Sequence, residues 1–163
     1  TFLSAVSKAR PKVADYPFTT LAPNLGVVEL SGFRSFVIAD IPGIIEGAHE
    51  GKGLGLRFLQ HIERTRVLAF MVPSNAEDLM AEYEALRNEV EQYSPTLADR
   101  PHVLVRTKAD LDLEGEVPNA PEALGCYSIS SVTRSGLNEL LEGLWVATRD
   151  VDGPAEDPEP WRP

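Results

Sequence analysis

Six consecutive apolar residues, Val67-Leu68-Ala69-Phe70-Met71-Val72, are the most informative segment of this 163-residue chain. A run without polar alternation predicts a strand that is covered on both faces. A helical stripe follows it, formed by Leu79, Tyr83, Leu86 and Val90. A covered strand joined to an amphipathic helix is the unit from which parallel sheets are built, so this segment predicts an α/β fold.

The segments on the C-terminal side of this run continue the same alternation. Val103-Leu104-Val105 and Cys126-Tyr127-Ser128-Ile129 predict two further buried strands. Just after the first run, Ser74-Asn75-Ala76-Glu77 predicts a capping box at the start of the next helix. A final helix is predicted from an apolar stripe, which consists of Leu137, Leu140, Leu141, Leu144 and Trp145.

The segments on the N-terminal side predict a helix and a hairpin. Thr1 to Ala9 has a helical pattern, while Gly26 to Leu30 and Ser35 to Ala39 are strand-like. Ser31-Gly32 between the two strands predicts a tight turn and therefore an antiparallel pair. The whole pattern predicts a mostly parallel sheet with helices on both faces, in which ligands bind at the loops that follow the strands.

Composition and charge exclude several classes of protein. With 43% hydrophobic and 25% charged residues, the chain is typical of a globular domain, and its apolar runs are too short to span a membrane. The net charge of −10 argues against a broad basic surface for nucleic acid, sequence-specific DNA included. A single cysteine, Cys126, cannot form an internal disulfide, which favours a cytoplasmic location.

The expected domain organisation is simple. We expect one domain over residues 1–149, an acidic, proline-rich disordered tail over residues 150–163, and a monomer.

Two short motifs next to predicted strands carry chemistry suited to phosphate and metal binding. In Asp40-Ile41-Pro42-Gly43, the carboxylate can hold Mg²⁺ through water and the glycine N–H can approach a phosphate oxygen. Thr19-Thr20 lies in the loop before the hairpin, where a threonine hydroxyl can ligate Mg²⁺ when a γ-phosphate orders the loop. Taken alone, each motif has a plainer interpretation, as a Pro-Gly turn or as a β-prone pair in a surface loop.

Two further motifs suit a purine base. In Thr107-Lys108-Ala109-Asp110, the Asp110 carboxylate can accept hydrogen bonds from N1 and N2 of guanine, and the Lys108 stem can cover the base. The backbone N–H groups of Ser130-Ser131-Val132 could meet the guanine O6. The plainer interpretations are a helix cap with a surface lysine and a turn rich in hydroxyl residues. All four motifs stand in the order that a nucleotide site on a parallel sheet requires, so together they favour nucleotide binding.

Longer segments carry a family resemblance. They are Tyr16-Pro17-Phe18-Thr19-Thr20-Leu21, Pro23-Asn24-Leu25-Gly26-Val27-Val28, Asp40-Ile41-Pro42-Gly43-Ile44-Ile45-Glu46-Gly47-Ala48, Gly51-Lys52-Gly53-Leu54-Gly55 and Phe58-Leu59-Gln60-His61-Ile62-Glu63-Arg64-Thr65. Through these segments the chain resembles the Obg family of GTPases over residues 1–148. The resemblance implies a Ras-like P-loop G domain that binds GTP and GDP and slowly hydrolyses GTP with Mg²⁺. It also implies association with the large ribosomal subunit and a role in its assembly.

The resemblance implies a role for each matching residue, although no catalytic side chain is predicted. Thr20 resembles the magnesium ligand of switch I, and Asp40 resembles the residue that holds Mg²⁺ through water. Lys108 and Asp110 would read guanine. The implied GTP-binding residues are Phe18, Thr19, Thr20, Leu21, Ala22, Asp40, Ile41, Pro42, Gly43, Thr107, Lys108, Ala109, Asp110, Ser130, Ser131 and Val132.

The chain departs from the family pattern at three places. It contains no G-x-x-x-x-G-K-[ST] phosphate loop, and Gly51-Lys52-Gly53 is only a near miss. We therefore expect the chain to begin just inside the first helix, without the first strand and the phosphate loop, and to bind GTP weakly with little turnover. Thr107 replaces asparagine, which predicts base binding weaker by roughly 1 kcal/mol. Ile44 stands where Ras-like proteins place a water-orienting glutamine, so hydrolysis should be slow.

Two other functions are compatible with parts of the sequence. The missing phosphate loop, Thr107 and Ile44 suit a module that docks on a ribosomal or protein partner without hydrolysing nucleotide. An enzyme of another class has less support, because the chain has no Cys/His metal spacing, nucleophile elbow or dinucleotide fingerprint. The primary prediction is a GTPase for the parent protein, with docking as the alternative.

Overall fold

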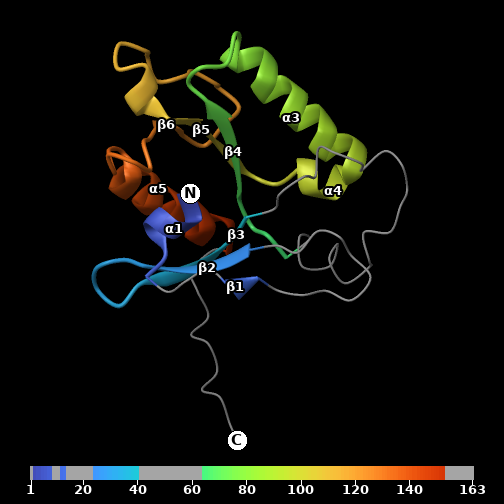
Figure 1. The fold of residues 1–163 in the computed structure, drawn as a ribbon. Helices are drawn as coiled ribbons and strands as arrows, with labels where there is room; N and C mark the ends of the chain where they lie inside the picture. The colour runs from blue at the N-terminus through green and yellow to red at the C-terminus, as the bar shows by residue number, and fades with distance from the viewer. Residues whose placement is uncertain (1, 9–11, 14–23, 41–63, 153–163) are drawn as a thin grey trace, which may run out of the picture.

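A computed structural model of the chain describes residues 2–8, 12–13, 24–40 and 64–152 (Figure 1). Its C-terminal part contains a parallel sheet with strand order β4-β5-β6. The strands are β4 (Leu68–Pro73), β5 (His102–Thr107) and β6 (Cys126–Ser128). The apolar run at residues 67–72 is therefore a strand, as predicted, and it pairs in parallel with β5 from Leu68↔His102 to Pro73↔Thr107.

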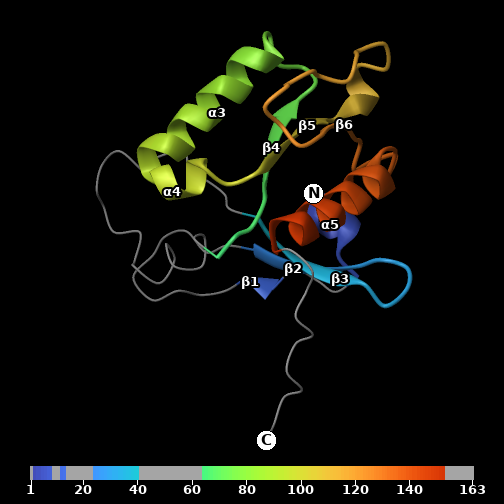
Figure 2. The same cartoon turned by 180° about the vertical axis from the view of Figure 1, so that it is seen from behind.

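Helices cover both faces of this sheet. Helix α3 (Leu79–Tyr93) and the short α4 (Pro95–Ala98) lie on one face, and α5 (Leu137–Asp152) lies on the other (Figures 1 and 2). A short 3₁₀ helix, η2 (Ala109–Leu111), follows β5. The predicted α/β class is confirmed.

Two hydrophobic clusters explain why the strands have continuous apolar runs. Leu104 of β5 belongs to the cluster beneath α3, whereas its neighbours Val103 and Val105 belong to the cluster beneath α5. All three side chains are at most 1% exposed. A strand buried on both faces needs apolar residues at every position, so the run loses the alternation of a half-exposed strand.

The N-terminal part forms a second sheet. Strands β2 (Asn24–Glu29) and β3 (Ser35–Asp40) make the predicted antiparallel hairpin, and β1 (Lys12–Val13) pairs with β2. Helix α1 (Phe2–Val6), shorter than the helix predicted over residues 1–9, packs on β2 where Gly26 has no side chain. A Cβ at Gly26 would lie 2.6 Å from Leu3 Cδ1, so glycine permits this close approach.

Side-chain burial rather than strand pairing joins the two sheets. Within the described residues, no backbone ladder links β3 to β4. Instead, Phe36 and Ile38 of β3 pack against the cluster that contains Leu140 and Leu144 of α5. The parallel sheet predicted for the chain is thus formed by β4, β5 and β6, and the hairpin lies beside it as a separate sheet.

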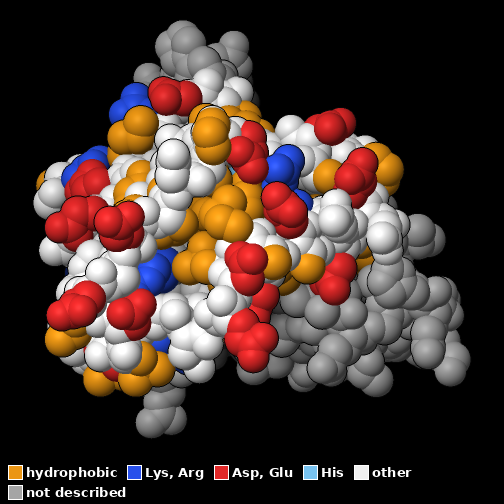
Figure 3. Space-filling model, turned by 90° about the horizontal axis from the view of Figure 1, so that it is seen from above, with side chains coloured by type: hydrophobic (Ala, Val, Ile, Leu, Met, Phe, Trp, Pro, Cys, Tyr) orange, Lys and Arg blue, Asp and Glu red, His pale blue; other side chains and the backbone are white. Residues whose placement is uncertain are grey.

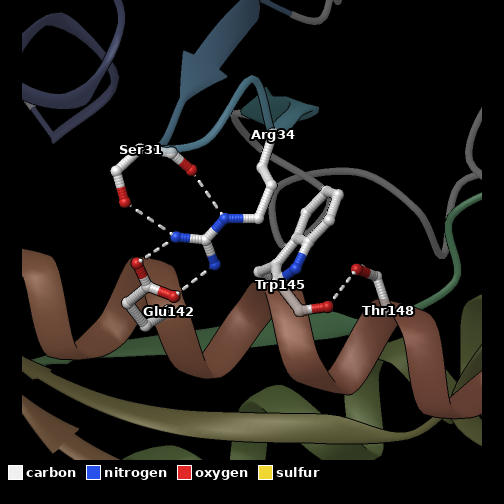
Figure 4. A network of polar contacts seen from close by, with 5 residues as sticks. All are labelled: Ser31, Arg34, Glu142, Trp145 and Thr148. Atoms are coloured by element: carbon white, nitrogen blue, oxygen red, sulfur yellow. Dashed lines mark hydrogen bonds and ion pairs between the residues drawn. The ribbon is translucent and has the colours of Figure 1, made fainter.

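A polar network also fastens the hairpin to α5 (Figure 4). Arg34 Nη1 donates to Glu142 Oε2 at 2.7 Å, and Arg34 Nη2 donates to Glu142 Oε1 at 2.9 Å. The same guanidinium lies 5.8 Å from the centre of the Trp145 ring. This pairing raises the pKa of Arg34 and lowers the pKa of Glu142, with the hydrogen bonds between them as the largest cause.

One prediction about a helix end was wrong. The capping box at residues 74–77 does not form, because α3 begins later, at Leu79, with Asp78 as its N-cap. The Asp78 carboxylate accepts from the Ala81 N–H at 3.0 Å. Ser74 is instead used by the loop that follows β5, as described below.

The stripe of the last helix was predicted well. Leu137, Leu140, Leu141 and Leu144 are buried, and Trp145 is half-buried. The helix extends to Asp152, three residues past the predicted domain end at 149, and residues 153–163 of the predicted tail lie outside the described residues. None of the helices in the described part of the chain is long and apolar enough to span a membrane.

Candidate functional site

Three loops meet at the carboxyl edge of the parallel sheet, at the top of Figure 1. They follow β4, β5 and β6, and the register places Pro73 beside Thr107 and Arg106 beside Ser128. The carboxyl edge of a parallel sheet is where α/β proteins bind ligands. The two predicted base-reading motifs, residues 107–110 and 130–132, are therefore brought side by side.

Backbone contacts from both neighbouring loops shape the first motif. Lys108 has a left-handed backbone, with φ 54° and ψ 39°. Ser74 Oγ donates to the Lys108 carbonyl oxygen at 2.7 Å, and the Ser74 N–H donates to the Thr107 carbonyl oxygen at 2.8 Å. On the other side, the Ala109 N–H donates to the Ile129 carbonyl oxygen at 3.0 Å. These contacts offset the strain of the left-handed turn and hold the Lys108 side chain exposed at the edge of the sheet.

A short hydrogen bond joins the two motifs. The Ser130 hydroxyl donates to Asp110 Oδ1 at 2.5 Å and accepts from the Thr133 N–H at 3.1 Å. Ser130 is fully buried, so its hydroxyl orientation is well defined. The bond holds one oxygen of the half-buried Asp110 carboxylate, and it leaves Oδ2 without a hydrogen-bond partner among the described residues.

The residues around this pair differ in exposure. Ser131 and Thr107 are half-buried, whereas Val132 is 78% exposed. The Ser130 N–H donates to the Ser135 carbonyl oxygen at 3.0 Å, which leaves Ser131 and Val132 as the predicted backbone donors to a base. A carboxylate, backbone N–H groups and an apolar side chain are the components that a flat heterocycle with adjacent N–H donors requires. The site can therefore bind a purine that carries N–H donors at neighbouring positions.

Figure 3 views the molecule from this edge. Acidic side chains lie across the described surface and surround a central group of apolar side chains, with scattered basic ones between them. The distribution agrees with the net charge of −10. On this face the described residues form no broad basic patch.

The predicted phosphate and metal residues lie elsewhere or outside the described residues. Asp40 is the last residue of β3, is exposed, and pairs in register with Asn24. The carboxyl end of β3 lies near the start of β4 in both ribbon views, and hence not at the edge where the base-reading motifs meet (Figures 1 and 2). Phe18, Thr19, Thr20, Leu21, Ala22, Ile41, Pro42 and Gly43 fall outside the described residues.

The donor chemistry present nevertheless fits Mg²⁺. Asp40 is an exposed carboxylate at a strand end, and a single carboxylate with water ligands is a common way to bind this ion. In the described ranges, no three His, Cys, Asp or Glu residues cluster as a complete metal cage. The residues therefore suit an ion that shares its coordination with water and phosphate rather than a structural metal.

Two residues that the sequence did not single out support the site. Ser74 was assigned to a helix cap, yet its side chain holds the Lys108 turn. Arg106 lies next to the end of an apolar strand, yet its side chain is only 4% exposed and contacts Asp112 and Ser128, each two residues from one of the two motifs. A charged residue inside the run 102–106 was the one available signal, because such a residue is buried only with partners.

Comparison with known proteins identifies the family. Residues 1–108 match the family model described as "50S ribosome-binding GTPase". The chain belongs to this family. It is 51% identical over 161 residues to the GTPase Obg of Chlorobium phaeovibrioides, covering 98% of this chain and 48% of that protein. It is 56% identical over 150 residues to the GTPase Obg of Parabacteroides distasonis, covering 89% of this chain and 39% of that protein.

The resemblance to Obg GTPases is therefore confirmed, and the chain spans about half the length of the curated relatives it matches. Solved structures support the fold of this Obg-type chain. The G domain of the Thermotoga maritima FeoB iron transporter matches with a TM-score of 0.60 at 16% identity, covering 90% of this chain and 88% of that domain. The cytosolic domain of the same transporter in its GMPPNP form matches with a TM-score of 0.62, covering 91% of this chain and 59% of that one.

Proposed function

We propose that this Obg-type chain carries the base-reading half of a guanine-nucleotide site in a GTP-hydrolysing protein. The observation that carries the proposal is the hydrogen bond from Ser130 to Asp110, which fixes one carboxylate oxygen and leaves the other for a base. Guanine presents two adjacent N–H donors, at N1 and N2, and a carboxylate accepts both. Adenine lacks this pair of donors, so the site favours guanine over adenine.

The neighbouring residues complete the contacts with the base. The aliphatic stem of Lys108 covers one face of the guanine, and the backbone N–H groups of Ser131 and Val132 lie near O6, because the Ser130 N–H already donates to the Ser135 carbonyl oxygen. Thr107 offers a single hydroxyl donor and a short reach, so it contributes less than an amide would at the same position. These roles are supported by the placement of both motifs at one edge of the sheet.

The remaining predicted roles concern the phosphates and the metal. Thr20 and Asp40 would hold Mg²⁺, which neutralises charge on the phosphates when bound. Residues 18–22 and 40–43 would contact the γ-phosphate end of GTP. Ile44 cannot orient an attacking water, so we expect slow unassisted hydrolysis.

The place of action follows from the family. We propose that the parent protein acts on the large ribosomal subunit, during its assembly, in the cytoplasm and as a monomer. The 163 residues contain no G-x-x-x-x-G-K-[ST] loop. Because that loop supplies most phosphate contacts in such proteins, we expect this chain alone to bind nucleotide weakly and to turn over little GTP.

Exchange of one carboxylate for an amide tests the base-reading role. In Asp110→Asn, one acceptor becomes an N–H donor, so GDP should bind at least about tenfold more weakly. Xanthosine diphosphate carries a carbonyl acceptor at C2 in place of the amino group, so it should bind the variant better than the wild type. Nuclear magnetic resonance titration of the chain measures both affinities, including weak ones.

Asp150→Asn is the matched control, because Asp150 is an exposed carboxylate on α5. It should leave both affinities unchanged. If the wild-type chain binds GDP and xanthosine diphosphate equally, or if Asp110→Asn binds GDP like the wild type, the proposed base-reading role is wrong.

A docking module without hydrolysis remains the second candidate. Thr107 and Ile44 favour it, because neither side chain supplies the contact that the amide of asparagine or glutamine would make at the same position. This candidate predicts that the chain binds large ribosomal subunits equally well with and without GDP. Co-sedimentation with purified subunits decides between the two, since nucleotide-dependent binding would contradict simple docking.

A further inference from the structure

Arg106 is the only arginine or lysine that is buried among the residues the structure describes. Its side chain is 4% exposed, and it is the penultimate residue of β5, directly before the predicted base-reading motif that starts at Thr107. Burial of a guanidinium is unfavourable unless its N–H groups find acceptors, so the partners of Arg106 indicate why it is retained.

The partners come from the loop after β5, which carries Asp110, and from the last residue of β6, directly before the segment that carries Ser130. Arg106 Nη1 donates to Ser128 Oγ at 2.9 Å. Arg106 Nη2 donates to the Asp112 carbonyl oxygen at 2.6 Å and to Asp112 Oδ2 at 2.7 Å. Asp112 lies two residues after Asp110, and Ser128 lies two residues before Ser130. One side chain thus connects the loop after β5 to the end of β6, and its contacts lie two residues from Asp110 and two residues from Ser130.

The backbone is arranged around this side chain. The Arg106 carbonyl oxygen accepts from the Ile129 N–H at 2.8 Å, so the main chain and the side chain of Arg106 both hold the start of the second loop. Gly115 closes a turn on Asp112, and a Cβ at Gly115 would collide with the guanidinium. The planar guanidinium of arginine has several N–H donors and can reach Asp112 and Ser128 together, whereas the single ammonium group of lysine could not contact both.

We propose that Arg106 is a positioning residue for purine selectivity. By tying Asp112 to Ser128, it sets the distance between the Asp110 carboxylate and the backbone N–H groups of Ser131 and Val132. The proposal rests on the proposed function, and it concerns which base is accepted rather than whether phosphates bind.

The test compares GDP with inosine diphosphate, which lacks only the N2 amino group. A well-placed Asp110 accepts from N2, so the wild-type chain should prefer GDP by about tenfold or more. Arg106→Gln removes the charge and can reach only one loop, so the preference should fall to less than about threefold. Nuclear magnetic resonance titration gives both dissociation constants for each variant.

Arg87→Gln is the matched control. Arg87 also forms an ion pair, with Glu122 at 3.0 Å, but it lies on α3 away from the base-reading loops. A general loss of stability would weaken both nucleotides equally and leave their ratio unchanged, so Arg87→Gln should keep the wild-type preference.

The outcomes separate the two proposals. If folded Arg106→Gln keeps the wild-type preference, Arg106 does not position Asp110, and the base-reading role survives. If the wild-type chain itself fails to prefer GDP, the base-reading role fails and the inference about Arg106 falls with it.

Should Arg106→Gln not fold, Ser128→Ala provides a second test. It removes the half-buried hydroxyl that accepts from Arg106 and should reduce the preference for GDP about twofold. An unchanged preference in Ser128→Ala would then overturn the inference.

Discussion

Two glycines share a left-handed backbone but differ in their surroundings. Gly136 has φ 71° and Gly32 has φ 75°. A Cβ at Gly136 would collide with the Ser128 carbonyl oxygen, whereas a Cβ at Gly32 would meet nothing within 4 Å. Substitution of each glycine by alanine should therefore lower the free energy of unfolding for different reasons. At Gly32 only backbone strain contributes, whereas at Gly136 a steric collision is added.

Gly136→Ala should lower the free energy of unfolding by roughly 3 kcal/mol, because strain and collision add. Gly32→Ala should lower it by about 1 kcal/mol, because only the left-handed backbone is penalised. Urea denaturation followed by circular dichroism measures both values. Equal effects of the two substitutions would show that the crowding against Ser128 is relieved without cost.

At the scale of elements, the start of α3 depends on one side chain. Asp78 accepts from the Ala81 N–H at 3.0 Å and satisfies a donor that the helix cannot pair internally. The sequence predicted the cap at residues 74–77, since Ser74 and Glu77 have capping-box spacing. Ser74 is used instead by the Lys108 turn, which is a contact between separate loops.

Asp78→Ala should therefore reduce the free energy of unfolding by about 1 kcal/mol, through loss of the N-cap bond. Glu77→Gln is the control, because Glu77 is exposed and lies before the helix; it should change stability by less than about 0.5 kcal/mol. Thermal and urea denaturation measure both variants. If Glu77→Gln destabilises the chain as much as Asp78→Ala, residues 74–77 form the cap after all.

The stability of the whole molecule should depend on pH through His102. This side chain is buried, and its Nε2 lies 2.6 Å from the Tyr83 hydroxyl. Burial, with a smaller contribution from Arg87, lowers the pKa of His102 below its ordinary value of 6.5. Burial also raises the pKa of Tyr83 to about 12, so the hydroxyl keeps its proton and can donate to the neutral imidazole.

The lowered pKa of His102 determines how the stability of the chain changes with pH. Below pH 6.5 the unfolded chain takes up a proton on His102 before the folded chain does, so stability is lost as the pH falls from 6.5 toward the lower folded pKa. Urea midpoints at pH 8, 7, 6 and 5 should decline more steeply for the wild type than for His102→Gln. Parallel declines in the two proteins would mean that other groups carry the acid sensitivity.

The order and type of the elements were predictable because they depend on neighbouring residues. The run at residues 67–72 has no polar position, and the stripe from Leu137 to Leu144 repeats at helical spacing, so both patterns identify their elements without knowledge of the fold. The rule that ligands bind at the carboxyl ends of parallel strands then placed Lys108 and Asp110 beside Ser130.

What the amino-acid sequence determined by itself was therefore the α/β class, the hairpin and the position along the chain of the motifs proposed to read a base. Only the tertiary structure decided that Arg34 forms an ion pair with Glu142, 108 residues away in the chain. It also decided that Arg106 connects Asp112 to Ser128, and that the hairpin forms a sheet of its own. The physical reason is the range of the interactions. Periodic burial is recorded in consecutive residues, whereas the partner of a polar side chain depends on which distant segments the packed core brings within hydrogen-bond distance.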